Sequence, residues 1–184
     1  MTTTERVAPL PPEERDERQA ELVRRAGAEA GVYTTLVRAT DVFADFLPFG
    51  RRMLRLSSLA PREREMLIMR TAFRCSAAYE WSHHDVIGRG VGLDDPDLEL
   101  LARGTVADGD ADERTVLLIR AADELVADHI LGDATWARLA EAYPVPQIIE
   151  ICLLVGEYAM LAGALNSLGV QIEPGYPQPA WDEP

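Results

Sequence analysis

Lysine is absent from this chain of 184 residues, because all 18 of its basic residues are arginines. A Schiff base with a carbonyl substrate or with pyridoxal phosphate needs a lysine amine, so lyases of that mechanism are excluded. Positive charge is also scarce overall, since 31 acidic residues give a formal net charge of −13. A chain so acidic repels polyphosphates and anionic membrane surfaces, and we expect neither nucleic acid nor a membrane as partner.

Cysteine is also rare. The two cysteines, Cys75 and Cys152, each lie in an apolar helical pattern, so a disulfide framework is not indicated. The N-terminal residues contain no apolar signal core, and the most apolar run, 148–168, is interrupted by Glu150 and Glu157. We therefore expect a cytoplasmic protein without a membrane span, and a structural role for Glu157.

Helical periodicity of hydrophobic residues is frequent along the sequence. Hydrophobic residues make up 47% of the chain, and they recur at spacings of three and four without strand-like alternation of useful length. The pattern predicts an all-α, multi-helix bundle of about eight helices. We expect a single helical domain over residues 12–173, a disordered N-terminal arm over 1–11 and a Pro-rich tail over 174–184.

Three details of this pattern are specific enough to test. A helix of about 15 residues is expected to begin near Pro12, with acidic residues in its first turn. Residues 32–56 are expected to form two short helices separated at Pro48 and Gly50. Asp133 is expected to cap the helix that follows it.

The residues most suited to chemistry lie in the predicted helix that contains Tyr-Glu-Trp-Ser-His-His. Glu80 and His84 are four residues apart, so their side chains share a face and Glu80 can fix the tautomer of His84. Glu65, on the preceding helix of a predicted hairpin, is expected to reach the same pocket. The competing interpretation is a solvated surface pair, which is common at this spacing. His83 points about 100° away from His84 on the helix.

The run from about residue 51 to 170 resembles the carboxymuconolactone decarboxylase family. The resemblance is carried by SSLAPREREMLIMRTAFRCSAAYEWSHHDVIGRGVGL, DERTVLLIRAADEL, DATWARLAEAY and GEYAMLAGALNSLGV, in that order. It implies the fold of the alkylhydroperoxidase D-like type and, commonly, homo-oligomers that are trimers or hexamers.

In the alkylhydroperoxidase D-like branch, a Glu is followed on the next helix by Cys-x-x-Cys-x-x-x-His, whose thiols reduce peroxides. Matched to this chain, the Glu falls on Glu65, the His on His84 and the two thiols on Ala77 and Glu80. Cys75 has no partner at the required spacing, so a dithiol peroxidase cycle is not expected. The chain thus resembles a branch with Ala-x-x-Glu in place of Cys-x-x-Cys.

The resemblance implies a lyase or isomerase without a cofactor or metal, which decarboxylates or isomerises a small carboxylated or lactone substrate by acid/base chemistry. We expect His84 to be the general acid/base, Glu80 to orient it and Glu65 to position a proton or water. The expected pocket wall and substrate-binding residues are Tyr79, Trp81, Arg70, Arg74 and His83.

Three alternatives stay open at this point. Glu65, Glu80 and His84 would suit iron or manganese as a carboxylate-rich metal site. The chain would otherwise be a peroxidase-related protein that has lost dithiol activity, or an oligomerising scaffold without catalysis, for which the apolar C-terminal helix is the main support.

Overall fold

The computed structural model describes residues 4–181, and the expected disorder of residues 1–3 lies outside the described part. The described residues form nine α-helices and a short 3₁₀ helix at Pro12–Glu14, and contain no strand, which confirms the all-α fold. The α-helices are α1 (Glu17–Ala26), α2 (Gly31–Leu36), α3 (Thr40–Arg55), α4 (Pro61–Arg74), α5 (Ala78–Gly90), α6 (Asp95–Leu101), α7 (Glu113–Ala127), α8 (Asp133–Ala142) and α9 (Val145–Leu168).

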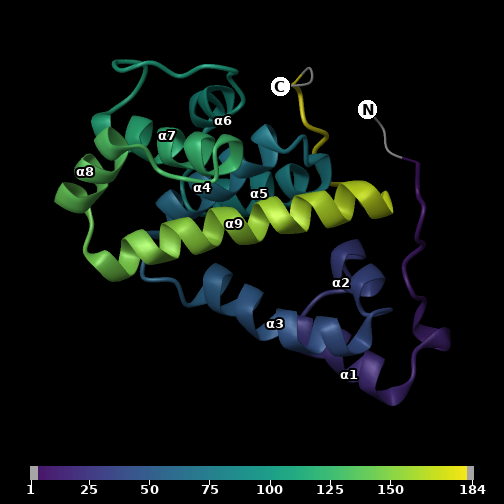
Figure 1. The fold of residues 1–184 in the computed structure, drawn as a ribbon. Helices are drawn as coiled ribbons and strands as arrows, with labels where there is room; N and C mark the ends of the chain where they lie inside the picture. The colour runs from purple at the N-terminus through teal and green to yellow at the C-terminus, as the bar shows by residue number, and fades with distance from the viewer. Residues whose placement is uncertain (1–3, 182–184) are drawn as a thin grey trace.

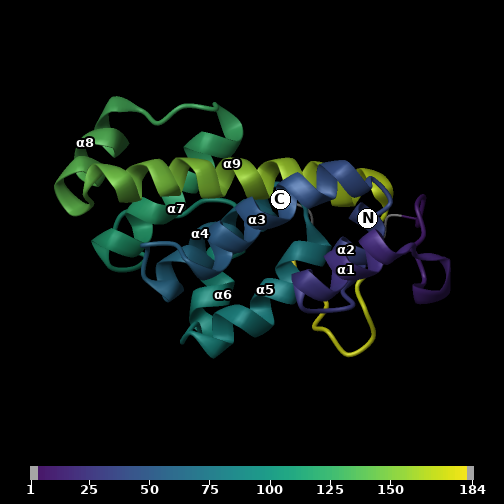
Figure 2. The same ribbon diagram turned by 90° about the horizontal axis from the view of Figure 1, so that it is seen from below.

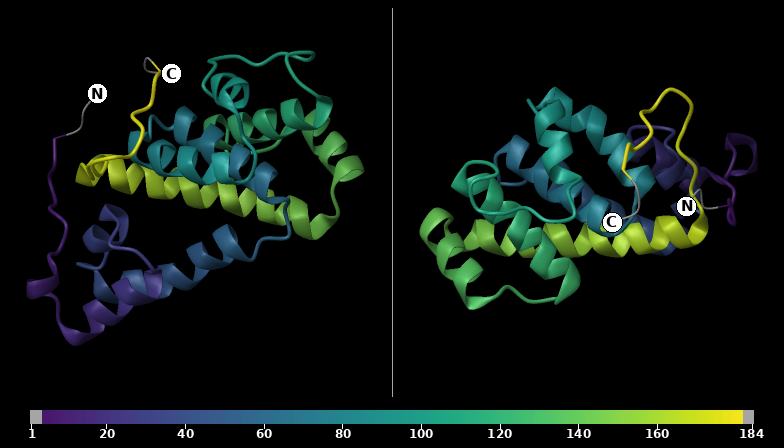
Figure 3. Two further views of the ribbon diagram at one scale, coloured as in Figure 1. Left: turned by 180° about the vertical axis from the view of Figure 1, so that it is seen from behind. Right: turned by 90° about the horizontal axis from the view of Figure 1, so that it is seen from above.

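Helix α9 divides the molecule into two layers (Figure 1). On one side, α4 packs against α5, α7 and α9, with α6 and α8 at the periphery. On the other side, α1, α2 and α3 form a smaller layer, and α3 contacts α9 (Figure 3). The residues of α4 from Glu65 to Phe73 are all buried, so this helix is the centre of the larger layer.

The main core lies between α4, α7 and α9. Leu67, Leu118, Ile151 and Leu154 are each at most 1% exposed and belong to one contiguous cluster. Burying a side chain of this size contributes about 1.5–3 kcal/mol, so these helices are held together chiefly by apolar contact. The core fixes α4 and, through it, the position of α5.

A tight connection joins α4 to α5. The backbone N–H of Ala77 donates to the carbonyl of Ala72 at 2.8 Å, and Ser76 between the helices takes a positive φ of 51°. The two helices therefore form the predicted hairpin. The second helix ends at Gly90, and Gly92 just beyond it has a φ of 95°, as a glycine near a helix end allows.

The first α-helix begins at Glu17, so the prediction of a start near Pro12 was wrong. Asp16 accepts a hydrogen bond from the backbone of Gln19, whose side chain bonds back to Asp16. This reciprocal capping box satisfies two backbone N–H groups at the start of α1 and places that start at Glu17.

The predicted break at Pro48 was also wrong, because α3 continues through it and the interruption falls at residues 37–39. Proline inside a helix costs one hydrogen bond and about 3 kcal/mol. Phe43, Leu47 and Met53 are nevertheless buried along α3, and burial of three large side chains offsets that cost. At α8 the cap is Gly132, one residue before the predicted Asp133.

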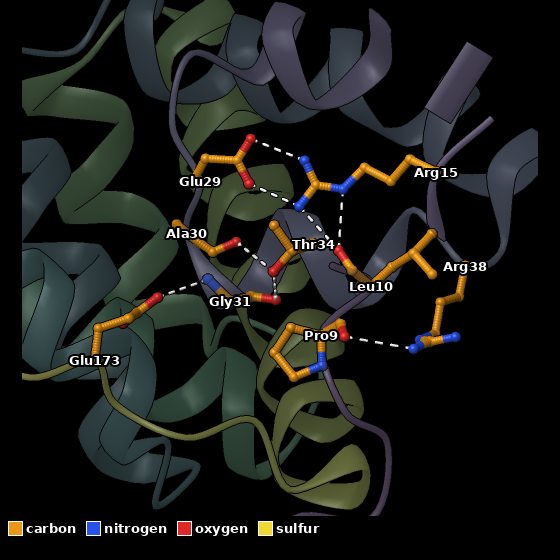
Figure 4. Close-up of polar contacts among 9 residues, drawn as sticks. All are labelled: Pro9, Leu10, Arg15, Glu29, Ala30, Gly31, Thr34, Arg38 and Glu173. Atoms are coloured by element: carbon orange, nitrogen blue, oxygen red, sulfur yellow. Dashed lines mark hydrogen bonds and ion pairs between the residues drawn. The ribbon is translucent and has the colours of Figure 1, made fainter. Parts of the chain in front are cut away.

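Residues 4–11 are held against the protein, which differs from the disorder expected of this arm. The N–H groups of Arg6 and Val7 both donate to the carbonyl of Leu168 at the end of α9. The N–H of Leu10 donates to Thr34 at 2.7 Å, and Arg15 binds both the Leu10 carbonyl and the carboxylate of Glu29 (Figure 4). Composition alone did not reveal these partners, because they lie far away in sequence.

The C-terminal tail also belongs to the folded body. It loops between α5 and the α1–α2 region (Figure 2), where the hydroxyl of Ser82 donates to the carbonyl of Pro177. The ring of Trp181 packs edge-on against the rings of Trp81 and Phe73, with ring centroids 4.2 and 5.5 Å apart. The described part of the tail, up to Trp181, therefore packs against the core of the larger layer, and residues 182–184 of the expected Pro-rich tail lie outside the described part.

By length and hydropathy, α9 is the one described helix that could cross a membrane, with 44% of its apolar window buried in the protein. A long core helix has the same length and composition as a membrane span. Part of α9 is exposed and apolar, at Val145, Ile149, Leu153 and Met160.

Candidate active site

A cavity of about 250 Å³ lies between the α1–α3 layer and helices α5 and α9. Tyr176 of the C-terminal tail also lines it. The wall is mainly apolar and aromatic, and several ionisable side chains face into it. These are Arg51, Arg55, Glu80, His83, His84 and Glu157.

The best-defined polar contact in this wall joins Glu65 on α4 to His84 on α5. Glu65 is fully buried, and its Oε2 lies 2.7 Å from Nδ1 of His84. The other carboxyl oxygen, Oε1, accepts a hydrogen bond of 3.0 Å from Arg64. Burial alone would raise the pKa of Glu65, but the hydrogen bond and charge of His84, with those of Arg64, outweigh burial and lower the pKa.

An ionised Glu65 requires Nδ1 of His84 to be its protonated nitrogen, an assignment made from the hydrogen bond. In the neutral ring the lone pair then lies on Nε2, which has no hydrogen-bond partner among the described residues. The ring also packs edge-on against Tyr158, with centroids 5.1 Å apart. His84 is thus held at two points and presents a basic nitrogen to the cavity that it lines.

Glu80 does not orient His84, which corrects the arrangement expected from their spacing. Neither carboxyl oxygen of Glu80 has a hydrogen-bond partner among the described residues. Sharing a helix face permits contact between positions four apart but does not require it. Here Glu65, from the facing helix, lies at Nδ1 instead and is the residue that orients the imidazole.

Glu80 and Glu157 are two buried carboxyl groups that electrostatics favours in the neutral form. Glu80 is 3% exposed, and burial, followed by the charge of Glu157, raises its pKa well above the ordinary value. Glu157 is 5% exposed, and burial raises its pKa to about 7. A Cβ at Gly50 would lie 3.0 Å from Oε1 of Glu157, so the glycine leaves room for this carboxyl group.

Sequence reasoning placed Glu157 among the structural residues and so missed it. The available signal was a carboxylate within an otherwise apolar helix, which is costly to bury without a partner. Nothing in the sequence showed that the smaller layer would open a cavity beside it.

His83 lies in the cavity wall, as expected, but it is held by the C-terminal tail. Its ring stacks between the rings of Tyr79 and Tyr176, with ring centroids 4.4 and 4.0 Å away. Its Nε2 lies 2.7 Å from Oε2 of Glu173. Glu173 also accepts hydrogen bonds from Tyr79 at 2.9 Å and from the backbone of Gly31 at 2.6 Å. Burial opposes ionisation, but the bonds from His83, Gly31 and Tyr79 outweigh it and lower the pKa of Glu173 to about 2.

Three residues expected to bind substrate lie outside the cavity lining. Arg70 is fully buried and binds both carboxyl oxygens of Asp123, at 2.6 and 2.7 Å. Arg74 lies 3.6 Å from the same carboxylate, and Trp81 packs against the tail. The positions of the two arginines follow from α7, which brings Asp123 against α4.

Arg51 and Arg55 on α3 line the cavity instead. The sequence contains a hint of this site, since both arginines lie toward the end of one helix, four residues apart. That α3 would face α5 across the cavity was not readable from the chain.

The ligand set of the metal alternative is not assembled within residues 4–181. Among these residues, no group of three or more His, Cys, Asp or Glu side chains is placed so as to hold a metal ion. Both carboxyl oxygens of Glu65 are engaged by His84 and Arg64. The donors present therefore do not fit the three-ligand site that was considered.

The two cysteines are free and poorly suited to redox chemistry. Burial, with the charge of Glu80 adding to it, raises the pKa of Cys75 to about 11, and burial raises that of Cys152. The thiolate is the reactive form, so both side chains are weak nucleophiles near neutral pH.

No family model and no curated protein matches this chain. Solved structures do, and two of them are peroxidase-related proteins. One is a peroxidase-related protein with an alkylhydroperoxidase AhpD core from Ralstonia eutropha JMP134, at a TM-score of 0.70 and 20% identity over 90% of this chain and 87% of that one. The other is a peroxidase-related protein from Silicibacter sp. TM1040, at a TM-score of 0.69 and 18% identity over 96% of each chain. Likeness at these identities establishes the architecture, and the chain has an AhpD-like fold.

Proposed function

We propose that this protein is a carboxymuconolactone decarboxylase-like enzyme that uses acid/base chemistry without a cofactor to decarboxylate or isomerise a small carboxylated or lactone substrate. The observation that carries the proposal is the Glu65–His84 pair, which leaves Nε2 of His84 free beside a cavity with two further buried carboxyl groups.

In this proposal His84 moves the proton. Its free Nε2 accepts a proton from the substrate or, once protonated, donates one to a substrate carbon. The imidazolium that forms is stabilised by the ionised Glu65, which also keeps the ring in place. Glu65 is therefore the positioning residue for His84.

Glu80 and Glu157 supply the complementary chemistry. The raised pKa of Glu80 favours its protonated form near neutral pH, and a pKa of about 7 keeps part of Glu157 protonated there, so these carboxyl groups donate a hydrogen bond to a developing enolate oxygen. The same fold thus lowers the pKa of Glu65 and raises that of Glu80. Glu65 is therefore suited to support His84 as an ionised carboxylate, and Glu80 is suited to act as an acid.

Both candidate reactions need the same groups. Loss of CO₂ from a carboxylate beside an unsaturated lactone leaves a dienolate, whose oxygen needs a hydrogen-bond donor and whose carbon needs a proton. An isomerisation removes a proton at one carbon and returns it at another through the same intermediate.

The peroxidase-related names of the two structural neighbours suggest a second function. Against it, Ala77 and Glu80 occupy the positions where the alkylhydroperoxidase D-like branch has thiols, and the cysteines that are present have raised pKa values. A disulfide-forming cycle has no suitable thiol pair in this chain.

The experiment is incubation of the purified protein with 4-carboxymuconolactone in D₂O, with CO₂ release and deuterium incorporation followed together. Chelator-treated protein is compared with protein supplied with iron or manganese, and a parallel assay offers hydroperoxide with a dithiol. The proposal predicts metal-independent CO₂ release with deuterium on carbon. Turnover only after metal addition would contradict the proposal in favour of a metal enzyme, and dithiol-dependent peroxide reduction would contradict it in favour of a peroxidase.

A further inference from the structure

We infer that the cavity receives its substrate as a carboxylate anion and that Arg55, on the α3 side, is the residue that binds this carboxylate. The inference rests on the proposed function and deepens it by assigning the recognition site and the charge of the substrate.

Arg55 is the cavity-lining arginine that has no hydrogen-bond or ion-pair partner among residues 4–181. All 18 arginines lie in the described part of the chain, and most of them donate to a carboxylate or a backbone carbonyl. Two line the cavity. Of these, Arg51 donates to the carbonyl of Arg25 at 2.9 Å, whereas Arg55 has no hydrogen bond or ion pair with any residue from 4 to 181. In a chain with 31 acidic residues, a cavity-lining guanidinium without an acceptor has its donors free for a ligand.

The positive charge of Arg55 acts on the cavity wall. Burial raises the pKa of Tyr33, another lining residue, while the charges of Arg55 and then Arg51 oppose this rise. An arginine presents its N–H donors as a planar fork that matches the two oxygens of a carboxylate. The α3 side of the cavity is therefore suited to an anion of that shape.

The facing side does not repel such an anion. Burial raises the pKa of Glu80 well above its ordinary value and that of Glu157 to about 7, which reduces the negative charge on both, and the carboxylate of Glu65 is paired with His84 and Arg64. An anion at Arg55 would raise the pKa of both neutral carboxyl groups further, so substrate binding and protonation of these groups support each other.

The cavity also limits the size of the substrate. Its volume of about 250 Å³ lies below the ~300–1,000 Å³ of sites for drug-sized ligands, so a small organic acid fits better than a nucleotide. Aromatic side chains between the two sides suit an unsaturated or planar carbon skeleton: Tyr33, Phe46, Tyr79 and Tyr158.

The arrangement indicates which carboxylate is bound. An ion pair with Arg55 stabilises a carboxylate in the ground state, which disfavours its own loss as CO₂. The anchored group is therefore one that the reaction retains, while the reacting carbon lies toward His84 and Glu80 on α5. A substrate that is decarboxylated here carries a second carboxylate.

The test is direct binding, which needs no turnover. Isothermal titration compares trans-cinnamate with its neutral amide, trans-cinnamamide, on wild-type protein and on Arg55→Gln, Arg55→Lys and Arg52→Gln. Arg52 is the matched control, since it is exposed on the same helix, outside the cavity lining, and its substitution changes the net charge equally.

We expect Arg55→Gln to weaken cinnamate binding about tenfold or more, as loss of a charge-assisted hydrogen bond does. The cinnamate affinity of Arg55→Lys should lie between those of wild type and Arg55→Gln, and that of Arg52→Gln should equal the wild-type affinity. The neutral amide should bind weakly, with the same affinity for all four proteins. Equal cinnamate affinity in wild type and Arg55→Gln, or an equal loss in Arg52→Gln, would overturn the inference. Arg55-dependent binding without turnover of any lactone would instead contradict the proposed function alone.

Discussion

Oε2 of Glu65 lies 2.7 Å from Nδ1 of His84, although the two residues belong to different helices and are 19 positions apart in sequence. The contact sets the protonation of both groups, because an ionised carboxylate requires the imidazole to donate from Nδ1. It therefore determines which ring nitrogen meets the cavity. The position of α5 on α4 is thus part of the chemistry.

The Glu65→Gln variant tests this contact. The amide is neutral and has its own N–H donors, so it no longer enforces protonation at Nδ1 of His84. We expect nitrogen NMR to show Nδ1–H as the dominant tautomer in wild type and a mixed population in the variant, with turnover reduced about 10²–10⁴-fold. The control is Glu99→Gln, at an exposed position of α6. An unchanged tautomer in Glu65→Gln would mean that another group orients the ring.

Glu157 gives the protein a stability that depends on pH. Its pKa in the folded protein is about 7, against an ordinary value of 4.5, so the folded state binds this proton more tightly than the unfolded state. The stabilisation is fully present below about pH 4.5 and is lost as the pH rises through about 7, by roughly 3 kcal/mol. Glu80 adds a change of the same sign, since its pKa is also raised.

Glu157→Gln should remove the contribution of this residue. We expect urea denaturation to show that the variant gains stability relative to wild type between pH 5 and pH 8, with the difference levelling off above about pH 8. Glu99→Gln again provides an exposed control. A constant difference between Glu157→Gln and wild type across this range would show that Glu157 titrates normally.

The C-terminal tail is expected to stabilise the site through Glu173. Glu173→Gln loses the ionised acceptor for His83, Tyr79 and Gly31 and should lower the free energy of unfolding by about 1–3 kcal/mol at pH 7. Because the pKa of Glu173 is lowered to about 2, the difference should hold above about pH 4.5 and shrink as the pH falls toward 2.

Gln178→Ala, at an exposed position of the same tail, is the control for this variant. Urea midpoints and slopes, read by circular dichroism across the pH range, make the measurement. Equal stability of Glu173→Gln and Gln178→Ala at neutral pH would show that the tail contacts add nothing to the fold.

The cysteines are predicted to be dispensable. With the pKa of Cys75 raised to about 11 and that of Cys152 also raised, both thiols should react slowly with a disulfide reagent at pH 7.5 and faster as the pH approaches 10. The double variant Cys75→Ala/Cys152→Ala should retain full turnover of the substrate. Loss of turnover in that variant, with its fold intact, would restore a thiol mechanism.

The parts of the fold that the sequence predicted well are those with strong local signals. Pro61 at the start of α4, Gly90 near the end of α5 and Pro144 before α9 each mark a boundary through backbone chemistry alone. Pro48 carries the same local signal but lies inside α3, because burial of its neighbours outweighed one lost hydrogen bond. Tertiary contacts decide whether a proline ends a helix, and the local sequence of that helix does not show these contacts.

The same distinction applies to the site. Helix periodicity and the short link between α4 and α5 were enough to predict that five residues lie near one another: Glu65, Tyr79, Glu80, His83 and His84. The partner of His84 was not predictable in this way, since two glutamates were within reach. Arg70 was chosen by its position on α4 and proved to be neutralised by Asp123, 53 residues away. Contacts across such separations need the packed structure.

The most direct test of the account is a comparison of three histidine variants in the 4-carboxymuconolactone assay. His84→Asn removes the imidazole of the Glu65 pair, His83→Asn removes the ring held by the tail, and His129→Asn removes an exposed imidazole at a position with a φ of 59°, which asparagine tolerates. With all three folded by circular dichroism, the account predicts that CO₂ release and deuterium incorporation are lost in His84→Asn, reduced in His83→Asn and unchanged in His129→Asn. Turnover by His84→Asn at the wild-type rate would contradict the assignment of proton transfer to His84.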